Sequence, residues 1–60
     1  MDLKGRRLAC GLTQQQLAML CGFSLRSINR WESGSKIERI YLTRLERVLR
    51  AQERKKGEKP

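Results

Sequence analysis

The sequence contains no histidine and only two cysteines, so it lacks the side chains that most metal sites and many enzymes need. Cys10 and Cys21 are too few for a disulfide framework, and without histidine they cannot complete a zinc site. We therefore expect two free thiols, no metal and no cofactor. The carboxylates do not cluster with a nucleophile and a base, so an enzyme is not expected.

Long hydrophobic runs are also absent. No apolar stretch approaches the ~18 residues of a membrane-spanning helix, and no secretory hydrophobic region follows Met1. We expect a soluble cytoplasmic protein. The 60 residues can form only one domain, and a chain of this size buries only about 60% of the surface that its unfolded form exposes. A deep cleft for a small-molecule ligand is not expected.

Acidic residues are scarce. Lys and Arg together number 14 against 6 Asp and Glu, which gives a formal net charge of +8 and an isoelectric point near 10.6. Such a basic balance in a small domain favours a polyanionic partner. Nucleic acid fits best, and an anionic membrane surface is the second possibility.

No stretch shows the period-two alternation of a strand, whereas four segments carry helical signals. The sequence therefore predicts an all-α fold, a compact bundle of about four helices with a long C-terminal helix. The first helix is expected over about residues 3–10, with Asp2 as its N-cap and Gly11 at its end. Gly5 weakens this helix.

The second helix is marked by a capping box, in which Thr13 is followed three residues later by Gln16. We expect it to run to about Leu20, before Gly22 breaks it. Three residues are expected on its inner side: Leu17, Leu20 and Cys21.

A third helix is predicted over residues 25–32, with Ser24 as its N-cap and Gly34 as its C-terminal stop. At about 100° per residue, Ile28 and Trp31 share one side, which we interpret as the core side. The opposite side is polar and carries Arg26 and Arg30.

Ser35 and Glu38 form a second capping box, so the fourth helix is expected from about Lys36 to about Glu53. Residues 1–53 would then form the domain, and residues 54–60 a basic, disordered tail. The apolar arc of this helix spans about 200°, wider than the ~100° stripe that a small core uses. The surplus predicts a dimer interface formed by Ile40 with Leu42 or Leu49.

Residues 13–32 read TQQQLAMLCGFSLRSINRWE, two short helices joined by a turn at Gly22, which is the spacing of a helix-turn-helix. The motif opens with residues 11–14, GLTQ, and closes with residues 31–34, WESG; Leu17, Ala18, Gly22 and Ile28 stand in register between them. In these positions the chain resembles the Cro and phage-repressor family, also called the lambda-repressor-like or XRE family, over about residues 3–49. The resemblance implies that the second helix begins on the DNA backbone and that the third enters the major groove.

Carried over by position, the resemblance implies base contacts from five residues: Ser24, Leu25, Arg26, Asn29 and Arg30. It places Gln14 on a phosphate, and we expect further phosphate contacts from Ser33, Lys36 and Arg39. The residue chemistry points the same way, because arginine can bind guanine O6 and N7 in bidentate fashion and asparagine can bind adenine N6 and N7. We expect Arg26 and Arg30 to be the principal base readers.

Arg7 and Glu32 are expected to form a structural ion pair. Arg7 shares a helical face with Leu3 and Cys10, so burial of that face would draw its guanidinium inward, where it needs a carboxylate. Glu32 ends a helix, where the macrodipole disfavours a negative charge unless a cation holds it. The resemblance implies the same bridge. Arg6 and Gly5 depart from the family, in which many members carry an apolar residue and a better helix former.

These features predict a small transcriptional regulator, Cro-like or phage-type, that binds double-stranded operator DNA at the nucleoid. One helix reads only a few base pairs, so a homodimer on half-sites about 10 base pairs apart is expected. The alternative is an antitoxin-like or coactivator-like protein-interaction module with weak DNA reading. A third possibility is a basic amphipathic helix on a membrane, but its apolar face is needed for the core. The arginines of this helix can instead be ordinary solvent-exposed residues, and Glu46 with Arg50 is expected to form a common i,i+4 ion pair.

Overall fold

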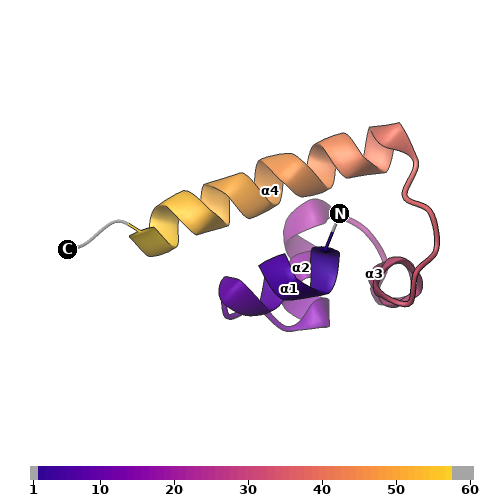
Figure 1. Cartoon of the computed structure of the whole chain (residues 1–60), viewed down its shortest axis with the longest axis horizontal. Coiled ribbons are helices and arrows are strands. Elements are labelled where there is room, and N and C mark those ends of the chain that lie inside the picture. The colour runs from indigo at the N-terminus through magenta and orange to yellow at the C-terminus, as the bar shows by residue number, and fades with distance from the viewer. Residues whose placement is uncertain (1, 58–60) are drawn as a thin grey trace.

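The computed structural model describes residues 2–57, with side chains through Lys55. Four helices follow one another: α1 (Leu3–Ala9), α2 (Gln14–Cys21), α3 (Leu25–Glu32) and α4 (Arg39–Gly57). No strand occurs in residues 2–57, so the predicted all-α fold is confirmed. Figure 1 shows α4 running along one side of the molecule, with α1 and α2 beneath it and α3 near its N-terminal end.

The first three helices begin at the predicted caps. Asp2 Oδ1 accepts a hydrogen bond from the Gly5 N–H at 3.0 Å and so caps α1. The capping box of α2 is complete: Thr13 Oγ1 accepts from the Gln16 N–H at 3.0 Å, and Gln16 Oε1 accepts from the Thr13 N–H at 2.8 Å. The predicted helix starts are therefore correct for α1 and α2, and the same holds for α3.

Each of these three short helices also ends with the same pair of hydrogen bonds. At the end of α3, the Ser35 N–H donates to the Arg30 carbonyl and the Gly34 N–H to the Trp31 carbonyl, both at 3.2 Å. This is a Schellman motif, and its Gly34 adopts a φ of +112°, in the region that favours glycine. The motif satisfies the last carbonyls of the helix and turns the chain sharply towards the next element.

The start predicted for α4 is wrong, because residues 35–38 are not helical. The Leu42 N–H donates to the Glu38 carbonyl at 2.9 Å, so Glu38 occupies the N-cap position and the helix begins at Arg39. Ser35 does not cap α4, because it belongs to the turn that ends α3 and lies four residues before the first helical residue, Arg39. The predicted capping box from Ser35 to Glu38 therefore does not form.

The predicted end of α4 at Glu53 is also wrong. The helix continues through Gly57, so residues 54–57 belong to it, and residues 58–60 of the predicted tail lie outside the described residues. Arg54 and Lys55 are good helix formers, and extending an established helix costs far less than nucleating one. A lack of apolar residues does not by itself end a helix.

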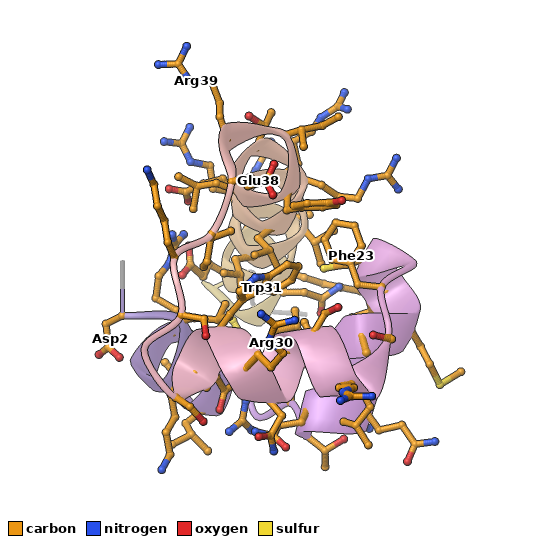
Figure 2. All side chains as sticks on the ribbon, turned by 90° about the vertical axis from the view of Figure 1, so that its right-hand side faces the viewer. Asp2, Phe23, Arg30, Trp31, Glu38 and Arg39 are labelled. Atoms are coloured by element: carbon orange, nitrogen blue, oxygen red, sulfur yellow. The ribbon has the colours of Figure 1, made fainter. Side chains whose placement is uncertain are left out.

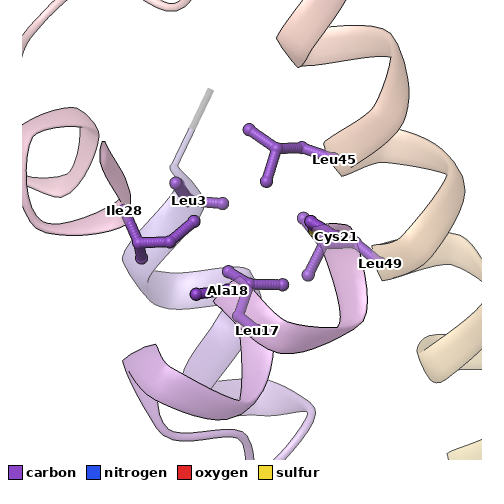
Figure 3. Close-up of a cluster of buried hydrophobic side chains, with 7 residues drawn as sticks. All are labelled: Leu3, Leu17, Ala18, Cys21, Ile28, Leu45 and Leu49. Carbon is purple, nitrogen blue, oxygen red and sulfur yellow. The ribbon is translucent and has the colours of Figure 1, made fainter. Parts of the chain in front are cut away.

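All four helices contribute to one buried cluster (Figure 3). It consists of seven apolar residues: Leu3, Leu17, Ala18, Cys21, Ile28, Leu45 and Leu49. The expectation that Leu20 belongs to this core is wrong, because 48% of its surface is exposed, while Ala18 is buried in its place. Burial of each large aliphatic side chain stabilises the fold by roughly 1.5–3 kcal/mol.

The three aromatic residues form a second packed group beside this core. Phe23 meets both Trp31 and Tyr41 edge-on with ring centroids 5.4 Å apart, and Trp31 lies 5.5 Å from Tyr41. Trp31 is half-buried and packs against the buried cluster, in line with the core role expected for it. The group joins the turn before α3, α3 itself and the first turn of α4.

Candidate nucleic-acid interface

Arg26 and Arg30 lie at the centre of the exposed face of α3. Each lies roughly 160° round the helix from the buried Ile28, at about 100° per residue. Both side chains are exposed, and neither forms a hydrogen bond or an ion pair with another described residue. In Figure 2, Arg30 points out of the molecule while Trp31, the next residue, points towards α4. Both guanidinium groups are therefore free to bind a partner.

The other predicted base-contacting residues flank these arginines. Ser24 begins α3, and its Oγ accepts a hydrogen bond from the Ser27 N–H at 3.1 Å. Leu25 and Asn29 are exposed on the side of α3 that faces the start of α2. Asn29 Nδ2 donates to Gln14 Oε1 at 3.5 Å, which links the two helices of the motif.

The side chain of Gln14 already forms two hydrogen bonds within the protein, so only part of it is free to bind a phosphate. Its Nε2 donates to Glu32 Oε1 at 3.0 Å, while its Oε1 accepts from Asn29. The residue is half-buried between the N-terminus of α2 and α3. One amide hydrogen remains for a phosphate, because a carboxamide nitrogen carries two.

Of the other residues predicted to contact phosphate, Ser33 and Lys36 lie beside α3 and Arg39 does not. Ser33 follows α3 directly, and its Oγ donates to the Asn29 carbonyl at 2.9 Å. Lys36 is exposed in the connection to α4 and, with Arg30, lines a hollow of about 450 Å³ beside α3. Arg39, by contrast, points away from α3 at the far end of the molecule in Figure 2.

Arg7 and Glu32 form a bidentate ion pair between α1 and the end of α3. Arg7 Nε donates to Glu32 Oε2 at 2.6 Å and Arg7 Nη2 to Glu32 Oε1 at 3.1 Å, while Nη1 donates to the Leu12 carbonyl at 2.7 Å. The two side chains are only 8% and 5% exposed. The pair therefore fixes α3 to α1 and to the loop before α2, and Gln14 adds the start of α2 to the same network.

The protonation of Glu32 follows from this network. Burial by itself raises the pKa of Glu32, but the hydrogen bonds from Arg7 and Gln14 and the charges of Arg7 and Lys4 outweigh it, and the pKa is held below its usual value. The hydrogen bond with Glu32 raises the pKa of Arg7 further above its ordinary value. Both groups are thus charged at neutral pH, and the pair is formed by full charges.

Sequence reasoning missed the role of Arg6, which binds two carboxylates of α4. Its Nε and Nη2 lie 3.0 Å from the two carboxylate oxygens of Glu53, and its Nη1 is paired with Glu46. Glu46 therefore pairs across helices, and the expected pair with Arg50 does not form within the described residues. These partners lie 40 and 47 residues away along the chain, so no local pattern reveals them.

The structure corrects the predicted dimer interface. Leu49 is fully buried in the core and cannot contact a second copy. Leu42 is half-buried, and it lies about 160° round α4 from Ile40, on nearly the opposite side. Only Ile40, with 72% of its surface exposed, remains open to a partner, beside Tyr41 with 39%.

Comparisons with known proteins agree with this geometry. A family model described as helix-turn-helix matches residues 3–54, from the start of α1 to the last turns of α4. No curated protein and no solved structure matches the chain. No helix in the described part of the chain is long and apolar enough to cross a membrane.

Proposed function

The chain belongs to the XRE-type, lambda-repressor-like helix-turn-helix family of DNA-binding transcription regulators, and on this premise we propose that it is a small Cro-like or phage-type repressor. In this proposal α3 enters the major groove of a short double-stranded operator. Transcription is then blocked because the bound protein occupies promoter DNA. The family consists of DNA-binding regulators and is typically non-enzymatic.

The observation that carries the proposal is the pair of unpartnered arginines on α3. Arg26 and Arg30 are exposed, and no carboxylate among the described residues neutralises them. Arginine has the donor geometry to bind guanine O6 and N7, and each such pair contributes about 1–3 kcal/mol of discrimination. In the proposal, Leu25 would touch a thymine methyl and Asn29 would read adenine, while Ser24 lies at the helix start.

Phosphate contacts would hold α3 in register. We assign them to Gln14, through its remaining amide hydrogen, and to Ser33 and Lys36, which lie beyond the other end of α3. Arg39 is left out of this set, because it points away from α3. Such contacts supply salt-dependent affinity but carry no sequence information.

We propose that two copies bind adjacent half-sites as a symmetric homodimer. The exposed apolar surface around Ile40 and Tyr41 is small, so the contact would form on DNA and leave a monomer in solution. Analytical ultracentrifugation of the free protein and of its complex with the operator tests this. A single copy per operator in the complex would contradict the dimer.

Selection of bound sequences from random duplex DNA, followed by fluorescence anisotropy on the best duplex, tests the proposal directly. The double variant Arg26→Ala, Arg30→Ala should lose at least about a hundredfold in affinity, since two bidentate contacts would be removed. The control Arg47→Ala, Arg50→Ala loses the same charge on α4 and should retain most of its affinity. Equal affinities for both variants would refute groove reading by α3.

A protein-interaction module is the second candidate function, and one observation favours it. Met19 is 74% exposed, and it borders a shallow apolar hollow with Leu12, Gln16 and Leu20 on the outer side of α2. Such a surface suits docking of a protein partner in an antitoxin-like or coactivator-like role. This function would be favoured if the Arg26→Ala, Arg30→Ala variant bound DNA as the parent does.

A further inference from the structure

A stripe of arginines runs along the solvent side of α4, outside the proposed interface. Four residues define this α4 stripe: Arg39, Arg47, Arg50 and Arg54. They fall within about 80° of one another on the helix and extend over about 22 Å, at 100° and 1.5 Å per residue. All four side chains are exposed. Repeated guanidinium groups along one line match the repeated charges of a phosphate backbone.

The acidic residues of α4 are engaged by α1 and neutralise this stripe only in part. Within the described part of the helix these are Glu46 and Glu53, and both are bound by Arg6 of α1. Arg6 thereby draws the two carboxylates to the side of α4 that faces the body of the molecule. Glu46 lies at the edge of the stripe, about 20° round the helix from Arg39, and the four arginines outnumber the two carboxylates in the described part of α4.

Three arginines of the stripe converge on one hollow. Arg39, Arg47 and Arg50 line a surface depression of about 380 Å³. Its other lining residues are Leu42, Thr43 and Glu46, and the Glu46 carboxylate is already paired with Arg6. The depression is thus bordered by three positively charged side chains and one carboxylate that is already paired.

The stripe faces away from α3. Arg47 lies roughly 160° round α4 from both Leu45 and Leu49, which point into the core. Figure 2 shows Arg39 directed away from the body of the molecule, with α3 at the opposite end of the view. Arg39 follows Glu38, which lines the hollow beside α3, whereas Arg47, Arg50 and Arg54 lie further along α4. We therefore expect a straight duplex bound by α3 to leave these three arginines free.

We infer that the α4 stripe binds the phosphate backbone of a second DNA duplex, so that one molecule links two DNA segments. The inference rests on the proposed function, since α3 holds the first duplex. The stripe carries arginines and no asparagine or glutamine, which is suited to phosphate contact without base reading. A membrane fits less well, because the exposed apolar side chains in the described part of α4 are Ile40, Tyr41 and Ala51, too few for insertion.

A two-duplex retention assay tests this inference. The selected 40-base-pair duplex is fixed to beads, protein is added, and a fluorescent 40-base-pair duplex of random sequence is offered in about 100 mM salt. The parent should retain the second duplex. Arg47→Gln, Arg50→Gln should reduce its retention by about tenfold or more, because two phosphate contacts would be lost. Binding of the first duplex, measured by anisotropy, should change by less than about threefold.

Two controls separate the stripe from net charge and from folding. Leu8→Glu, Met19→Glu lowers the net charge by the same two units at exposed positions outside the stripe and should still retain the second duplex. Arg47→Lys, Arg50→Lys keeps the charge and should also retain it. Circular dichroism checks that every variant is folded.

The possible outcomes are distinct. The inference would be overturned if retention fell equally in Arg47→Gln, Arg50→Gln and in Leu8→Glu, Met19→Glu. It would also be overturned if the parent bound one duplex but never retained a second. Displacement of the second duplex by phosphatidylglycerol vesicles at lower concentration than by competitor DNA would overturn it as well. If instead Arg26→Ala, Arg30→Ala bound the selected duplex as tightly as the parent, the proposed function would fail rather than the stripe.

Discussion

Arg7 Nε lies 2.6 Å from Glu32 Oε2, in an ion pair that is almost fully buried between α1 and the end of α3. A buried pair contributes little net stability compared with apolar packing, but loss of one partner leaves the other charge unpaired. The short α1 is therefore tied to α3 by charge as well as by Leu3 in the core.

Substitution of Glu32 by glutamine should destabilise the fold strongly. Arg7 would remain buried without a counter-charge, at a cost of about 3–5 kcal/mol. That is comparable with the whole stability of a domain of this size, roughly 3–9 kcal/mol. Urea unfolding followed by circular dichroism measures the loss. The double variant Arg7→Met, Glu32→Leu should recover much of the lost stability. An unchanged melting temperature in Glu32→Gln would show that the ion pair does not stabilise the fold.

Acid should destabilise the protein through the same carboxylate. Because the pKa of Glu32 is lower in the fold than in the unfolded chain, its stabilisation is complete above the ordinary glutamate pKa of about 4.3 and is lost as the pH falls through the folded value. The melting temperature should therefore drop as the pH falls below about 5. Glu32→Gln should show a flatter profile, with the remaining slope due in part to Glu53, whose pKa is also lowered by its hydrogen bond with Arg6. Parallel profiles would contradict this assignment.

Alanine at Gly22 should destabilise the turn between α2 and α3. Gly22 has a φ of +76°, and only Arg44 Nη1, at 3.9 Å, lies near the position of an added Cβ. The cost is thus one of backbone conformation rather than of crowding, about 1–2 kcal/mol. Thermal melts should rank Gly22→Asn between the parent and Gly22→Ala, since asparagine tolerates this conformation better. If Gly22→Ala melted at a higher temperature than Gly22→Asn, the turn would have changed its backbone conformation to accommodate the alanine.

Glutamine at Arg6 should loosen the C-terminal part of α4 with a smaller effect on global stability than Glu32→Gln. Its two ion pairs are partly exposed, and pairs of this kind contribute little. Hydrogen exchange of the amides of residues 50–57 should accelerate, while that of α2 should not. Uniform acceleration along the chain would instead assign Arg6 to the core fold.

Alanine at Lys36 should weaken binding of all duplexes alike. If Lys36 contacts one phosphate, the slope of log affinity against log salt should fall by about 1, with no change in the selected sequence. Anisotropy titrations at several salt concentrations measure it. A changed sequence preference would instead place Lys36 among the base readers.

The features that the sequence predicted well are local. Thr13 with Gln16 begins α2, Ser24 begins α3, and the glycines after α1, α2 and α3 end these helices, because each signal acts within a few residues. Prediction fails where two helices follow closely: Ser35 resembles an N-cap for α4, but it lies in the turn that ends α3, and α4 begins only after Glu38.

Other features depend on which elements meet in space. Leu20 and Ala18 are both apolar positions of α2, and which of them is buried depends on how the other helices pack against α2. The partners of Arg6 are remote in sequence, and Gln14 was expected on a phosphate without its bond to Glu32. The exposed position of Arg26 and Arg30, by contrast, follows from the helical period alone, so the centre of the candidate site was predictable.

The packing of Trp31 has a practical consequence for spectroscopy. It is the sole tryptophan in the chain, and it contacts Phe23 and Tyr41 on the side of α3 turned towards α4. Its fluorescence emission therefore reports whether α3 is docked on α4, without an added label. Trp31 also lines the hollow beside α3 together with Arg30 and Lys36, so DNA bound there would change the surroundings of the ring. A titration with DNA and a folding experiment can thus both be followed with the same natural fluorophore.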